Sequence, residues 1–381
     1  MKPVYIVSWL FALAISFVSC DDWLDKTPKD RLYPDVYFKT EDELRLFTNQ
    51  FYNNLVPSAV DIYSESSDLI VKSDLMLEMS GQRIIPDEGN GWNFTALRDI
   101  NFYLQYSHNC TEVNARNRYD GVARFFRAYF YFEKVKRYGD IPWYDKALDS
   151  DDPELYKARD SREFVMQKML EDLDFAIANL PKTKNAYVLT RWTALALKSR
   201  VCLFEGTFRK YHGLEDCEKY LNACVSASET FMNESGYTLY KSGSTPYRDL
   251  FASINLQADE VIFGRDYEAS LSVLHNVQNY ENSTTMGRPG MNKKIVNSYL
   301  MADGSRFTDK AGYETMTFDQ ECQNRDPRLA QTIRTPGYTR IGSTKKEAPN
   351  LAYTMTGYHL IKYSMTANSV SYTHLRAHET G

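Results

Sequence analysis

The sequence has few of the short motifs that identify enzymes and metal proteins. It contains no HExxH, no GxSxG and no glycine-rich phosphate-binding loop, and its six histidines form no evident triad. None of its six cysteines belongs to a CxxC pair, which argues against zinc ribbons and thioredoxin-like redox motifs. We therefore predict that the chain is not an enzyme and needs neither a cofactor nor a metal. A secreted helical glycan hydrolase stays an alternative, because paired carboxylates cannot be located in space from a sequence.

The chain also lacks an excess of basic residues. Lysine and arginine total 45 against 50 aspartates and glutamates, and the net charge is −5 over 381 residues. A nucleic-acid partner usually requires a basic face, so we predict no such partner. A chain of this length has room for one large domain, or for two ordinary domains with sizeable cores.

Residues 4–18 form an apolar run without any charge, and the run follows Lys2. It is too short to cross a bilayer comfortably, since a spanning helix needs about 20 apolar residues. A charged start, an apolar middle and a small residue before a cut are typical of a secretory signal. Residues 1–19 are therefore predicted to be a signal peptide.

Cys20 directly follows that segment, and residues 17–20, "FVSC", resemble a bacterial lipobox. This resemblance predicts that Cys20 is lipidated and that residues 20–39 form a lipid anchor and tether, with more than one acyl chain needed for lasting attachment. The alternative is a soluble secreted protein with an incidental cysteine. Asp21 and Asp22 resemble the surface-export signal of Bacteroidetes lipoproteins, which would place the chain on the outside of the outer membrane.

Apolar residues at helical spacing predict a helical domain over residues 40–236. Thr40 and Glu43 have the pattern of a capping box, and Thr190 stands where a later helix begins. Six helices are expected, beginning near residues 40, 93, 120, 160, 190 and 214. The strongest one has a single continuous apolar stripe before Gly139, made of Val122, Phe125, Tyr129, Phe132 and Val135.

These helices are joined by short loops and come in pairs. The pairs that begin near residues 120 and 190 carry Ala128 and Ala194, small residues that let helices approach closely, as in tetratricopeptide-like repeats. Ordinary bundle packing without a true repeat is the alternative. Cys217 and Cys224 lie seven residues apart on the apolar face of the last helix, which predicts that both are buried and that neither is a metal ligand.

The residue composition of the sequence changes after Tyr237. Loops rich in glycine, serine, threonine and asparagine alternate with short apolar pieces over residues 237–369. This alternation predicts an irregular region with short strands and occasional helices. Long loops carried on a rigid scaffold are where binding residues usually lie.

The chain is rich in aromatic residues, with 28 tyrosines and 20 phenylalanines. Aromatic rings pack between helices, and they also present flat faces on which sugar rings stack. Trp92, Tyr267 and Tyr280 lie in or near polar loops and are the predicted glycan-binding residues, with burial in the core as the alternative for each. Arg265 and Arg288 are the basic contacts expected if the glycan is acidic.

Seven stretches together carry a family resemblance: "GWNFTALRDIN", "RFFRAYFYFEKVKRYGDIPW", "TRWTALALKSRVCLF", "DEVIFGRDYE", "SYLMADGSRF", "NRDPRLAQTI" and "TGYHLIKYS". In this order, behind a lipobox, they resemble the SusD/RagB family, the glycan-capturing surface lipoproteins of Bacteroidetes. The resemblance covers roughly residues 20–366. It implies a mainly α fold, in which a tetratricopeptide-like helical-repeat domain packs against an irregular region with short strands and helices.

The same resemblance implies a function and a partner. Members capture oligosaccharides at the cell surface and deliver them to a SusC-like TonB-dependent transporter in the outer membrane. A peptide-capturing member of the family is an alternative, and so is a structural adaptor that uses its helical repeats to bind protein. The glycan itself does not follow from the sequence.

The end of the chain departs from the family pattern. Members are normally longer, and "SVSYTHLRAHETG" resembles a recurrent tail that arises when adapter-derived DNA is translated. Residues 370–381, from Val370, are therefore predicted to be non-native, and residues 237–369 to be an incomplete C-terminal region. His374 and His378 have the spacing of two metal ligands on a helix, but they fall within this tail.

Overall fold

A computed structural model describes most of the chain between residues 36 and 364. The described residues are 36–57, 69–73, 75–86, 89, 91–253, 255–265, 267, 273, 277 and 282–364. The predicted signal peptide, Cys20, Asp21, Asp22, Tyr280 and the predicted non-native tail lie outside this part.

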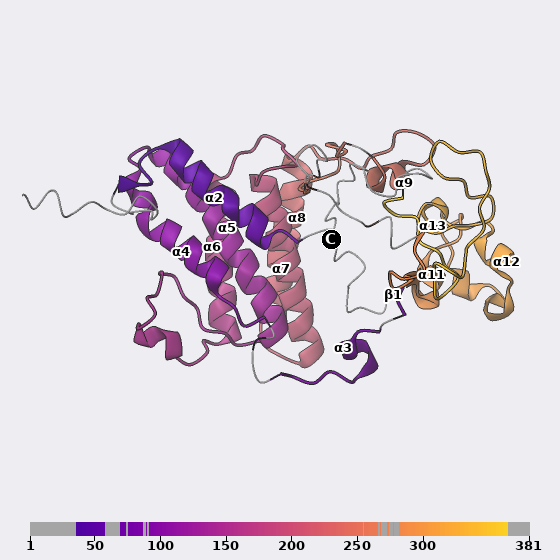
Figure 1. Ribbon diagram of the computed structural model, residues 1–381, viewed down its shortest axis with the longest axis horizontal. Helices are drawn as coiled ribbons and strands as arrows, with labels where there is room; N and C mark the ends of the chain where they lie inside the picture. Colours follow the sequence, from indigo (N-terminus) through magenta and orange to yellow (C-terminus); the bar gives the residue numbers. More distant parts are fainter. Residues whose placement is uncertain are drawn as a thin grey trace, which may run out of the picture.

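The first half of the described chain is a bundle of long helices (Figure 1). These are α2 (Glu41–Leu55), α4 (Thr95–Tyr106), α5 (Val113–Tyr138), α6 (Arg162–Asn179), α7 (Arg191–His212) and α8 (Cys217–Glu234). Helix α5 packs against α6, α6 against α7, and α7 against α8, so that consecutive antiparallel hairpins stack side by side. The short helices α3 (Leu77–Ser80), η4 (Ser107–Asn109) and η5 (Pro153–Tyr156) lie in the connections. The mainly α, tetratricopeptide-like fold is confirmed, and all six predicted helices are present, although α5 begins at Val113, seven residues before its predicted start.

Local chemistry fixes where these helices begin and end. Thr40 and Glu43 form the predicted capping box: the Thr40 hydroxyl accepts from the Glu43 amide at 3.3 Å, and the Glu43 carboxylate accepts from the Thr40 amide at 3.1 Å. Thr190 caps α7 in the same way, with Thr193 as its partner. Helix α5 ends before Gly139, whose φ of 70° suits a residue without a side chain.

Helix α5 is buried on more sides than its predicted stripe suggests. Ala123, Phe126 and Tyr131 lie off that stripe, yet each is at most 1% exposed. The reason is that α5 contacts four other long helices, namely α2, α4, α6 and α7. A single apolar face was therefore too narrow a prediction for the central helix of the bundle.

Helix α8 lies at the other extreme, at the edge of the bundle. Its contacts are mainly with α7, and only Tyr220 and Ala227 are fully buried along its length. Cys217 and Cys224 are therefore only half-buried, which corrects the prediction that both lie in the core. The contact with α7 is close at Gly206, where an added Cβ would lie 2.7 Å from the Leu221 side chain.

The second region is irregular, as predicted, and gathers at the other end of the molecule (Figure 1). Its short elements are α9 (Pro246–Phe251), α11 (Lys293–Ser298), η7 (Phe307–Asp309), η8 (Tyr313–Thr315), α12 (Phe318–Cys322) and α13 (Pro327–Ala330). The two-stranded antiparallel sheet pairs β1 (Ile70–Val71) with β2 (Gly290–Met291), with Ile70 opposite Met291. Since β1 precedes α4 in the chain, this pairing ties the segment between α2 and α4 to the second region.

Each region has its own apolar core. Aromatic rings make up much of the core of the helical bundle, where Phe38, Phe51 and Phe126 pack edge to face around Tyr103 and Tyr52. The second core is smaller and is built from Leu250, Val261, Tyr267, Ile333 and Leu360, among others. Among the described residues, no helix is both long enough and apolar enough to cross a bilayer.

Candidate functional site

Trp92 lies on the surface of the helical bundle, just before α4. Its side chain is 40% exposed. Phe94 and Tyr138 meet the indole edge to face, with ring centroids 5.3 and 5.0 Å away, and the Arg159 guanidinium lies 4.9 Å from its centroid. These contacts fix the ring while a large part of it stays accessible to solvent.

A glycine turn produces this position. Gly89 and Gly91 both have positive φ, at 73° and 80°, and the Trp92 amide donates to the Gly89 carbonyl at 3.0 Å. The Lys134 ammonium from α5 donates to the Gly91 carbonyl at 2.5 Å. A side chain at Gly91 would also approach the Tyr138 hydroxyl at 3.2 Å. The turn therefore holds Trp92 against the C-terminal end of α5.

Beside the indole is a cavity of about 290 Å³, which we name the Trp92 pocket. It is lined by Trp92, Phe94, Thr95, Leu97, Arg98, Asn101, Tyr144, Lys146, Leu148 and Leu155. Three aromatic rings and three leucines thus surround a few polar side chains, and the lining contains no carboxylate. Apolar walls with a few fixed polar groups are typical of small-ligand sites.

The far wall of the Trp92 pocket is residues 144–148, which a buried network holds against α4. The Asn101 side-chain amide (Nδ2) donates to the backbone carbonyls of Tyr144 at 2.8 Å and of Lys146 at 3.3 Å. The Asn101 side-chain oxygen (Oδ1) accepts from Arg127 at 3.2 Å. Arg127 in turn donates twice to the Asp172 carboxylate, at 2.7 and 2.8 Å. Burial alone would lower the pKa of Arg127, but the bonds to Asp172 outweigh it and raise that pKa, so the guanidinium stays charged.

The other predicted contacts have different positions. Tyr267 is 3% exposed and belongs to the second core, so its ring has no free face for a sugar; this corrects its prediction as a ligand contact. Arg265 donates to the Val56 carbonyl at 3.3 Å, and Arg288 donates to the Leu351 carbonyl at 2.5 Å. Both arginines therefore brace loops.

Several lining residues were missed by sequence reasoning. Arg98 and Leu148 are 50 residues apart and meet through a bond from the Arg98 guanidinium to the Leu148 carbonyl at 3.3 Å. Tyr144 and Lys146 follow "GDIPW", a helix-ending stretch that gives no sign of a binding wall. Within the described residues, no group of three or more His, Cys, Asp and Glu side chains could hold a metal ion.

Two family models match separate parts of the chain. The model described as "SusD family" matches residues 250–379, and the one described as "Starch-binding associating with outer membrane" matches residues 80–191. The first match extends into the segment predicted to be non-native, and that prediction stays a prediction.

Curated relatives come from Formosa agariphila. SusD-like protein P2 is 26% identical over 294 residues, which covers 72% of this chain and 55% of the relative. SusD-like protein P38 is 25% identical over 226 residues, or 54% of this chain and 43% of the relative. The chain therefore spans about half the length of the curated relatives that it matches.

Solved structures agree with the fold. A SusD-like protein from Bacteroides fragilis superposes with a TM-score of 0.71 at 20% identity, covering 92% of this chain and 75% of that one. A SusD-like carbohydrate binding protein from the same species gives 0.69 at 16% identity, covering 90% and 71%. The fold is thus that of the SusD-like helical-repeat proteins. Both family models match in order along the sequence, and they support the assignment of the chain to the SusD/RagB family.

Proposed function

We propose that this chain is a non-catalytic lipoprotein of the outer-membrane surface that captures oligosaccharides at the Trp92 pocket. It delivers them to a SusC-like TonB-dependent transporter. Lipidation of Cys20 attaches the protein to the membrane, and Asp21 and Asp22 direct it to the cell surface.

The observation that carries this proposal is the partly exposed Trp92 ring at a pocket that also contains Phe94 and Tyr144. Sugar rings present C–H faces that pack on aromatic rings, and their hydroxyls need a few polar partners. Arg98 and Lys146 supply donors at the rim, and both side chains are exposed enough to reach a ligand. The Trp92 pocket therefore offers both kinds of contact.

The family comparisons support the same ligand class. The model described as starch-binding matches residues 80–191, a range that contains every residue of the Trp92 pocket. One similar structure is described as a carbohydrate binding protein, and another is described with a xylogluco-oligosaccharide, at a TM-score of 0.55 and 18% identity.

Catalysis at this pocket is disfavoured by its lining. Most glycoside hydrolases use two carboxyl groups that flank the scissile bond. No Asp or Glu is among the lining residues of the Trp92 pocket. Binding without turnover is the function that this chemistry supports.

Affinity electrophoresis and calorimetry with starch, xyloglucan and laminarin test the proposal. We expect retention by at least one glycan, a dissociation constant between about millimolar and micromolar, and no new reducing ends. Trp92→Ala should weaken binding at least about tenfold without unfolding the protein. Tyr211→Ala removes an exposed ring on α7 and is the matched control, which should bind like the wild type.

Three results would count against the proposal. Steady release of reducing ends would identify a hydrolase. Retention of peptides instead of glycans would favour the peptide-capturing alternative. If Trp92→Ala bound glycan with wild-type affinity, the binding site would lie outside this pocket.

A further inference from the structure

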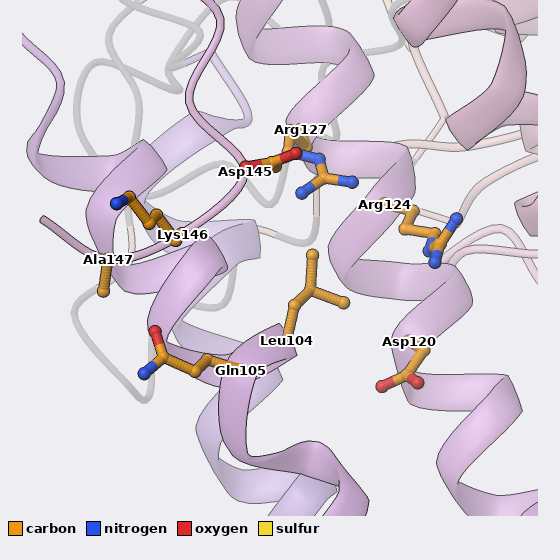
Figure 2. A pocket seen from close by; sticks show the side chains of 8 residues that line it. All are labelled: Leu104, Gln105, Asp120, Arg124, Arg127, Asp145, Lys146 and Ala147. Atoms are coloured by element: carbon orange, nitrogen blue, oxygen red, sulfur yellow. The ribbon is translucent and has the colours of Figure 1, made fainter. Parts of the chain in front are cut away.

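A second cavity, of about 520 Å³, lies between α4, α5 and residues 145–147; we name it the Asp120 pocket. Figure 2 shows the side chains that line it. Leu104 and Gln105 come from α4. Asp120, Arg124 and Arg127 come from α5, and the remaining lining residues are 145–147. It is larger and more polar than the Trp92 pocket.

Two charged side chains of this pocket have polar atoms without a partner. The Asp120 Oδ1 and Arg124 Nε atoms are buried and make no hydrogen bond within the described part of the chain. Burial raises the pKa of Asp120, although the Ser107 and Tyr103 hydroxyls and the charge of Arg124 act in the opposite direction. Buried polar atoms normally have partners, so Asp120 Oδ1 is left to accept a hydrogen bond from a ligand and Arg124 Nε–H to donate one.

The charges of the lining nearly cancel. Arg124, Arg127 and Lys146 line the pocket together with Asp120 and Asp145, and Arg127 and Arg124 both pair with Asp172, at 2.7 and 3.7 Å. A strongly charged ligand would therefore gain from some of these groups and be repelled by others. A hydroxyl both donates and accepts, so neighbouring hydroxyls can satisfy the carboxylate and the guanidinium together.

The two pockets are neighbours along α4. Arg98 and Asn101 line the Trp92 pocket, while Leu104 and Gln105 line the Asp120 pocket, and these positions share one face of α4. Lys146 lines both. Seven residues of helix correspond to a rise of about 10 Å, which is more than one sugar ring can span.

We propose that the Asp120 pocket is a second sugar subsite, which recognises the neighbouring hydroxyls of a neutral pyranose through Asp120, Arg124 and Gln105. This inference rests on the proposed glycan binding at Trp92 and extends it. One oligosaccharide stacks on Trp92, passes Lys146 and places a further ring in the Asp120 pocket. Long oligosaccharides then bind more tightly than short ones.

Calorimetry with two probe lengths tests the second subsite. The probes are a disaccharide and a longer oligosaccharide of whichever glycan among starch, xyloglucan and laminarin retains the wild type. Asp120→Ala removes the carboxylate, and Ala147→Phe fills the cavity from the opposite wall. Asp309→Ala, at an exposed position in the second region, is the matched control.

We expect both pocket variants to lose about tenfold in affinity for the longer probe, and to bind the disaccharide like the wild type. If Asp120→Ala does not fold, Ala147→Phe carries the test by itself. Wild-type affinity for the longer probe in a folded variant would show a cavity filled only by water and would overturn the subsite, while leaving the Trp92 proposal intact. If the wild type bound none of the three glycans, the proposed function and this extension would both fall.

Discussion

The ion pair between Arg127 and Asp172 gives the sharpest test of how the wall of the Trp92 pocket is held together. Asp172 is 3% exposed at its side chain and accepts two short bonds from Arg127, and it lies 3.7 Å from Arg124. Arg127 also bonds to Asn101, which holds residues 144–146. Asp172→Asn keeps the shape of the side chain and removes its charge.

The expected loss follows from burial. Breaking a buried pair costs about 3–5 kcal/mol, because an uncompensated charge remains in the interior. The asparagine oxygen can still accept one bond from Arg127, so we expect the lower end, about 3 kcal/mol. Asp174 lies two residues further along α6 and pairs with Lys198 at the surface, with 58% of its side chain exposed. Asp174→Asn should cost less than about 1 kcal/mol.

Urea unfolding followed by circular dichroism measures both variants under the same conditions. A difference between them of less than about 1 kcal/mol would refute the view that this buried pair stabilises the bundle. Replacing both partners, as Arg127→Met with Asp172→Leu, should recover most of the loss, since an apolar pair of similar volume leaves no buried charge. The double variant should still lose glycan affinity, because Asn101 no longer has its partner.

Three further predictions concern other parts of the chain. Burial lowers the pKa of Lys362 to about 8. Between pH 8 and pH 10.5 the folded state therefore binds fewer protons than the unfolded state. As a result, the contribution of Lys362 to the free energy of unfolding rises with pH across that window. The difference in free energy of unfolding between Lys362→Met and the wild type should therefore narrow by about 2 kcal/mol from pH 7 to pH 10, measured by urea unfolding. A difference that stays constant over this range would contradict this reasoning. Cys20→Ala should leave the protein folded and release it from membrane fractions, whereas continued sedimentation with outer membranes in cells without the transporter would disprove the anchor. Deletion of residues 370–381 should leave Tm unchanged, and a loss of about 1 kcal/mol or more would show that the tail is native structure.

Short-range sequence signals were sufficient for the helical scaffold. The capping boxes at Thr40 and Thr190 act within three residues, and Gly139 ends α5 through its own backbone conformation. Such effects depend on neighbours in the chain, so they can be read before any tertiary contact is known. Helical periodicity then predicted that α5 packs strongly, although it could not tell that α5 lies at the centre of the bundle.

The Trp92 pocket was decided by tertiary packing. Trp92 and Tyr267 both lie near polar loops in the sequence, yet the first is 40% exposed and the second 3%. Arg98 meets Leu148 across 50 residues, and Asn101 meets Tyr144 across 43, so the wall of the pocket has no local signature. A sequence determines which side chains are apolar and where helices start, because these depend on composition and short-range bonds. Whether a ring is covered depends on which distant segment packs over it, and only the folded chain determines that.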